Sequence, residues 1–172
     1  MKNIEYLQSK KNIIIYFSII ASLGLAIRLY FTPFNIPISL DGIDYFAYAV
    51  AMSREGIFPS GYILTNFGWP SFVSIFFTFA KDANMLTLMD LQRILSVVIS
   101  TLTIIPIYFL TKIFFRKEIA LLATILFLFD PRIIENSIAG ITDSLFILLT
   151  VLTLLFIFYK KSSLIYLSFI FV

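Results

Sequence analysis

The feature that most constrains this chain is an apolar run near its N-terminus, Ile13 to Phe31, in which Arg28 is the single charged side chain. A helix needs about 20 such residues to cross the hydrocarbon core of a bilayer. The remaining chain has the same character, since the 172 residues are 60% hydrophobic and 13% charged, with a mean hydropathy of +0.97. These values predict an integral membrane protein rather than a soluble domain.

Two absent residue types limit the chemistry. The chain has no Cys, so it contains neither a disulfide framework nor a thiolate metal site. It also has no His, which leaves Asp, Glu, Lys, Arg and Tyr for acid–base work. A bound metal would therefore be a hard cation held by oxygens, such as Mg²⁺ or Mn²⁺. The small net charge of +3 does not suggest a nucleic-acid partner.

We expect one membrane domain over residues 1–172, an all-α polytopic transmembrane helical bundle. The first apolar run is too long for a signal peptide and lacks a small-residue cleavage site, so we expect it to remain as an anchor. The final run is too short to span, which predicts that the sequence stops inside a helix and is the N-terminal part of a larger protein. The expected spans are 13–31, 94–115, 118–129 (extending further), 143–159 and 164–172.

A long first outer loop is expected over residues 32–93, with helices at 41–55 and 69–80. The two prolines between Thr32 and Ser39 keep that stretch non-helical, and Gly56 is a typical helix stop. The segment 69–80 is apolar throughout, but a helix of that length extends only about 18 Å against a core of about 30 Å. We therefore expect it to lie in the outer interface, with Trp69 at the depth of the lipid headgroups.

The distribution of Lys and Arg supports this assignment. If 69–80 does not cross, eight basic residues lie inside and five outside; if it crosses, the count is six inside and seven outside. The positive-inside rule favours the first arrangement, with a cytoplasmic N-terminus. Eight of the ten carboxylates then fall on the outer side: Asp41, Asp44, Glu55, Asp82, Asp90, Asp130, Glu135 and Asp143.

Two outer acids open the helix at 41–55. Asp41 and Asp44 are three residues apart, so on a helix they share a face with Tyr45 and Tyr48. Acids at a membrane face suggest a functional site. The simpler alternative is that Asp41 caps the helix and Asp44 complements its dipole.

The second outer loop, residues 130–142, carries a similar set of polar residues. Thr142 or Asp143 is expected to cap the following helix. Arg132 can pair with Glu135 at the surface, or it can neutralise a phosphate group.

Three patterns resemble membrane glycosyltransferases of the GT-C fold. Asp41, Tyr45 and Ala49 resemble the DExxYxxxA pattern of that fold. The run from Arg93 to Pro131 resembles the second and third spans of protein O-mannosyltransferases and aminoarabinose transferases. Ser137 to Asp143 is similar to the SxAGxxDxE run of the oligosaccharyltransferase catalytic subunit.

The resemblance implies a reaction and a set of site residues. A sugar on a polyprenyl-phosphate donor would be transferred, with inversion, to a protein, lipid or glycan acceptor at the outer face of the cell membrane. The implied catalytic residues are Asp41, Asp44 and Asp143, and the implied substrate contacts are Tyr45, Tyr48, Trp69 and Arg132. Asp41, Asp143 and Glu135 are the implied ligands of Mg²⁺ or Mn²⁺, if the enzyme uses a metal.

The chain departs from these patterns at two positions. Gly42 stands where the first pattern has its second acid, and Leu145 stands where the third pattern has its last. Two alternatives to an enzyme therefore stay open. The acids can bind a cation or proton in a transporter or flippase, or they can be structural in a non-catalytic membrane subunit.

Overall fold

The computed structural model describes residues 2–38, 41–57, 59, 67–80 and 82–159, with side chains from residue 13 onward. All regular structure in these ranges is helical, which confirms the all-α prediction. The described helices are α1 (Lys2–Phe31), α2 (Asp41–Glu55), α3 (Gly68–Phe79), α4 (Met85–Leu102), α5 (Ile104–Phe114), α6 (Lys117–Leu128), α7 (Pro131–Ile138) and α8 (Asp143–Phe158).

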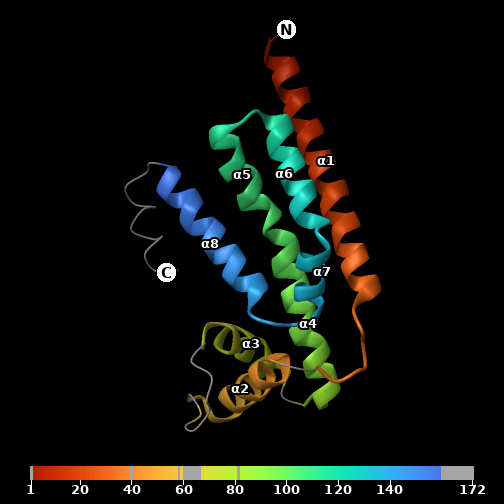
Figure 1. The fold of residues 1–172 in the computed structure, drawn as a ribbon, viewed down its shortest axis with the longest axis vertical. Helices are drawn as coiled ribbons and strands as arrows, with labels where there is room; N and C mark the ends of the chain where they lie inside the picture. Colours follow the sequence, from red (N-terminus) through yellow and green to blue (C-terminus); the bar gives the residue numbers. More distant parts are fainter. Residues whose placement is uncertain (1, 39–40, 58, 60–66, 81, 160–172) are drawn as a thin grey trace.

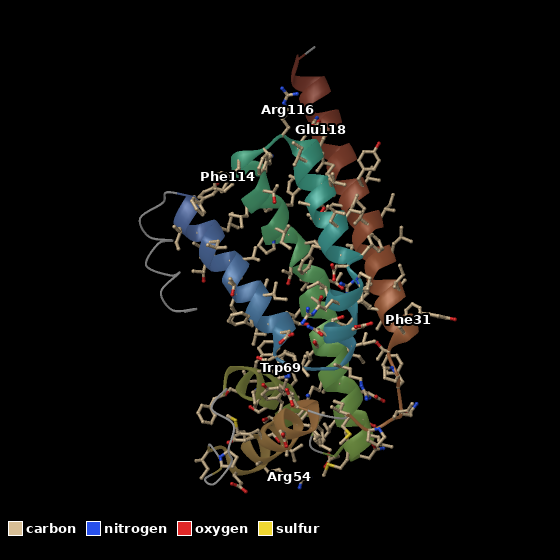
Figure 2. The ribbon with its side chains drawn as sticks, viewed as in Figure 1. Phe31, Arg54, Trp69, Phe114, Arg116 and Glu118 are labelled. Atoms are coloured by element: carbon tan, nitrogen blue, oxygen red, sulfur yellow. The ribbon has the colours of Figure 1, made fainter. Side chains whose placement is uncertain are left out.

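Helices α1, α4 with α5, α6 and α8 run side by side, and α2 and α3 lie together at one end of the molecule (Figure 1). The start of α1 and the turn between α5 and α6 form the opposite end (Figure 1). Figure 2 shows this separation at the level of side chains, with Arg116 and Glu118 at one end and Arg54 and Trp69 at the other.

Apolar packing between α2, α3 and α4 fixes the α2–α3 end. Phe46 of α2 meets Phe77 of α3 edge to face, with ring centroids 5.7 Å apart. Other buried members of the same cluster come from all three helices and from the segment before α2: Ile38, Tyr45, Ala49, Trp69, Val73, Leu88, Met89 and Ile99. Helix α3 is thus packed on its neighbours and not isolated at the surface.

The second apolar helix begins earlier than the sequence predicts, at Met85 rather than Ile94. The side chain of Asn84 caps it by accepting a hydrogen bond from the Thr87 N–H at 2.8 Å. The helix is interrupted at Thr103, because Pro106 has no N–H to bond to the preceding turn. The polar residues Asp90, Gln92 and Arg93 therefore belong to α4 and not to a loop.

Helix α1 extends beyond the predicted span 13–31 to Lys2, and its apolar segment Ile13–Phe31 agrees with that span. The predicted second loop contains a helix, α7, that the sequence does not predict. Asp130 caps α7 by accepting from the N–H groups of Arg132 and Ile133 at 2.9 and 3.1 Å, and Pro131 is the first helical residue. The predicted span 164–172 lies outside the described residues.

Many large apolar side chains are exposed, and several polar side chains are buried, unlike in a soluble protein. Large apolar side chains such as Leu126 and Phe146 are 65% and 66% exposed, while Gln92 and Thr124 are fully buried. Two helical segments, Ile13–Phe31 and Met85–Phe114, are long and apolar enough to cross a membrane. Exposed apolar faces around buried polar groups are what a hydrocarbon environment favours.

Candidate functional site

A cavity of about 430 Å³ opens where the start of α2, the first half of α4 and α7 meet. Its wall combines two carboxylates, Asp41 and Glu135, with the guanidinium group of Arg93 and the amide of Asn136. Its remaining lining residues are Pro33, Ile138, Ala139 and Ile141. The cavity therefore holds both signs of charge beside an apolar wall.

Close backbone packing places Asp41 at this cavity. Asp41 is the first residue of α2, and Gly42 follows it directly. A Cβ atom on Gly42 would overlap the Ile38 side chain and lie 3.1 Å from the Ala139 carbonyl oxygen. An acid at position 42 would not fit there, which gives a physical reason for the departure from the DExxYxxxA pattern.

Asp143 does not line the cavity itself but contacts a residue that does. Its carboxylate accepts a hydrogen bond of 2.6 Å from the Asn136 amide, and Asn136 lines the cavity. Thr142 occupies the N-cap position of α8, but its side chain makes no capping hydrogen bond. The predicted cap of this helix is therefore wrong for Thr142, and Asp143 bonds to α7 instead.

Arg93 is held in place almost entirely by the chain before α2 and by its own helix. It is 3% exposed, and its Nη1 donates to the Ile36 carbonyl at 2.7 Å and to Asp90 at 3.1 Å. Asp90 in turn accepts from the N–H of Asn35. The Nε of Arg93 is buried and has no hydrogen-bond partner among the described residues, so the guanidinium retains an unused donor.

Three aromatic residues predicted to contact substrate lie inside the molecule. Trp69 is fully buried, and its indole N–H donates to the Gly140 carbonyl at 2.9 Å. Tyr45 and Tyr48 are 8% and 1% exposed. The indole of Trp69 therefore packs inside the protein rather than facing lipid, and its depth at the lipid headgroups stays a prediction.

The remaining predicted residues are at the surface. Asp44 and Arg132 are exposed, and neither lines the cavity. The predicted shared face of the α2 acids and tyrosines is divided in the structure: Asp41 and Asp44 are exposed, while Tyr45 and Tyr48 are buried. Of the two α2 acids, only Asp41 reaches the cavity.

The predicted metal ligands do not form one group. Within the described ranges, no set of three or more Asp, Glu, His or Cys side chains is close enough to hold a metal ion. Asp41 and Glu135 share the cavity wall, and Asp143 is bonded to Asn136. A ready three-carboxylate metal centre is thus absent from this part of the chain.

Comparison with known families identifies the chain. Residues 70–171 match the family model described as dolichyl-phosphate-mannose-protein mannosyltransferase, which covers more than half of the sequence. The chain belongs to this family. Membership confirms the resemblance to GT-C glycosyltransferases, and with the two long apolar segments it makes the protein an integral membrane glycosyltransferase. No curated protein and no solved structure matches the chain.

The family match includes Arg93, Glu135, Asn136 and Asp143 but not α2. Asp41 therefore enters the site through its geometry and the sequence pattern around it. The sequence patterns do not mark Arg93, Asn136 or Gln92 as site residues. A signal was present for two of them, because Gln92 and Arg93 stand directly before a long apolar run, where polar residues are unusual.

Proposed function

We propose that the protein transfers a sugar from a polyprenyl-phosphate donor to an acceptor at the outer face of the membrane, with inversion at the anomeric carbon. The observation that carries this proposal is the cavity lined by Asp41, Glu135 and Arg93 in a member of a glycosyltransferase family. The family description names dolichyl phosphate mannose and protein, so a mannosyl donor and a protein acceptor are the first pair to test. Lipid and glycan acceptors are alternatives.

In the proposed reaction the carboxylate of Asp41 is the general base. An acceptor hydroxyl gives its proton to Asp41 while its oxygen forms a bond to the anomeric carbon. The bond between that carbon and the phosphate oxygen breaks, and its electron pair leaves with the polyprenyl phosphate. A single displacement of this kind inverts the anomeric configuration.

Arg93 supplies positive charge for the leaving phosphate. Arg93 lines the cavity, and its buried Nε–H has no partner in the described residues. Preorganised donors directed at a developing negative charge are effective because they need little reorganisation during the reaction.

The arrangement of charged residues supports an outer location for this cavity. Arg116 of the α5–α6 turn lies at the end opposite to α2 and α3 (Figure 2). Helix α3 packs against α2 at the cavity end, which supports the arrangement with eight basic residues inside and five outside. We therefore propose a cytoplasmic N-terminus and an active face outside. Lys160 and Lys161 of that count lie outside the described residues.

The test is sugar transfer by the Asp41→Asn variant. With polyprenyl-phosphate mannose and an acceptor peptide, we expect kcat to fall about 10²- to 10⁴-fold, the usual contribution of a general base. The matched control is Asp44→Asn, since Asp44 stands in the same first turn of α2 but does not line the cavity. We expect its rate to stay within a few-fold of the parent.

Three results would contradict the proposal. Equal losses in both variants would show that the acids act through helix stability and not through the cavity. Transfer that is unaffected by Asp41→Asn would remove Asp41 as the base. The absence of sugar transfer from any lipid-linked donor by the parent protein would reject the function itself.

A divalent cation needs a separate test, because the described carboxylates do not form a three-ligand centre. A cation at the cavity would take Asp41 or Glu135 as protein ligands and complete its coordination with phosphate and water oxygens. Since Arg93 already supplies positive charge, we expect transfer to persist in EDTA. A loss of activity that is restored by Mg²⁺ or Mn²⁺ would instead assign a metal to the site.

A further inference from the structure

We propose that Gln92 is a positioning residue that holds the start of α2 and the α7–α8 turn at a fixed separation, so that Asp41 and Asn136, the hydrogen-bond partner of Asp143, line the same cavity. This inference rests on the proposed function, because that function requires Asp41 and Asp143 to act at one site. The residue acts through backbone groups and does not touch the cavity itself.

The side-chain amide of Gln92 bridges two distant segments. It is fully buried on α4, and its Nε2 donates to the Gly42 carbonyl at 3.1 Å and to the Gly140 carbonyl at 2.8 Å. Gly42 follows Asp41 directly, and Gly140 stands in the turn between Asn136 and Asp143. One amide nitrogen therefore uses both of its N–H groups to join the two halves of the site.

Both acceptors are glycines for steric reasons. A Cβ on Gly42 would overlap Ile38, and Gly140 has a positive φ of 71°, a conformation that other residues rarely adopt. A Cβ on Gly140 would also lie 3.5 Å from the Gln92 side chain. The backbone thus contacts α4 at Gly140, whereas Gly42 is crowded by Ile38 and by the Ala139 carbonyl.

Stability alone does not explain a glutamine at this position. The Gly140 carbonyl also accepts from the Trp69 indole, so it would keep a partner without Gln92. The Oε1 of Gln92 is buried without a partner among the described residues, which costs free energy. An apolar side chain of similar size would avoid that cost, but it could not set the distance between the two carbonyls. The arrangement therefore favours a positioning role.

The first measurement is a distance that does not depend on activity. Because the chain has no Cys, spin labels can be attached at Arg54→Cys of α2 and Arg132→Cys of α7, both exposed sites. In Gln92→Met, which keeps the shape and loses both donors, we expect the label–label distance distribution to shift and broaden. In the control Ser100→Ala, a buried hydroxyl on the same helix without a partner in the described residues, we expect no change.

The second measurement is sugar transfer by the unlabelled Gln92→Met protein. A displacement of the acids of about 1 Å is expected to lower kcat by up to about 100-fold with little change in the donor KM. If the parent protein transfers no sugar, the proposed function fails, while the spin-label distances still decide the role of Gln92.

Unchanged distances in folded Gln92→Met would overturn the inference. Gln92→Asn is the second variant, because it keeps both donors but is too short to reach both carbonyls, and we expect the same broadening. If neither variant folds while Ser100→Ala does, Gln92 is a residue of stability and the positioning role is also overturned.

Discussion

At the scale of single residues, the contacts of Arg93 explain why its positive charge lies beside the cavity. Its ion pair with Asp90 and its bond to the Ile36 carbonyl hold the guanidinium against the cavity. A buried Arg with an unused N–H is costly unless something else satisfies it. A substrate phosphate would supply both the negative charge and the acceptor.

Replacing Arg93 with Gln should weaken donor binding. Hydrogen bonds to charged groups contribute about 1.5–3 kcal/mol, so we expect the donor KM to rise about 10- to 100-fold. The check is steady-state transfer with varied polyprenyl-phosphate sugar. The control Asp90→Asn removes the ion pair but keeps the bond from Arg93 to the Ile36 carbonyl, which should hold Arg93 at the cavity, so the donor KM should change much less. Equal effects in the two variants would make Arg93 a structural residue.

At the scale of elements, small residues decide how closely the helices approach. Gly24 of α1 faces Leu128 of α6, and a Cβ on Gly24 would overlap the Leu128 side chain. Leu128 is fully buried and has little room to move. Close contacts of this type drive helix association in membranes, where apolar surfaces gain little by leaving lipid.

Substituting Val for Gly24 should therefore separate α1 from α6. Overpacking of a well-packed contact costs about 1–3 kcal/mol, which would lower the midpoint of thermal unfolding in detergent. Ala26→Val, on an exposed position of the same helix, should have little effect. Adding Leu128→Ala to Gly24→Val should recover part of the loss. A midpoint for Gly24→Val equal to that of Ala26→Val would contradict the close contact.

At the scale of the whole molecule, the separation of Arg116 from Arg54 predicts the membrane topology (Figure 2). Both residues are exposed, and the chain has no Cys of its own. Single Cys substitutions at these positions should react with a membrane-impermeant maleimide from opposite sides of the membrane. Labelling of both from the same side would reject the proposed topology and the assignment of α3 to the outer face.

Helix α2 is the element that the sequence predicts best. Its predicted range, 41–55, agrees with Asp41–Glu55 in the structure. The two acids in its first turn and Gly56, with a φ of 70°, mark its ends by local chemistry. Helix α7 lies in the stretch 130–142 that the sequence predicts as a loop, although Asp130 followed by Pro131 is a typical helix start.

The site was only partly predictable. Asp41 and Glu135 were identified from the sequence and do share the cavity, whereas Asp44 and Arg132 do not line it. The sequence predicts Arg93 and Asp90 in the first outer loop, whereas both lie on α4. Their partners, Ile36 and Asn35, come from a distant part of the chain. No periodicity or spacing within α4 reveals those contacts.

The all-α membrane class, the position of α2 and the family follow from the sequence alone, because composition, apolar run length and helix-end signals do not depend on contacts between distant residues. Which polar groups meet depends on tertiary packing. The amide of Gln92 joins carbonyls 50 and 48 residues away, and the same packing buries Trp69, Tyr45 and Tyr48. Such contacts depend on how whole helices approach one another, and no local pattern encodes that approach.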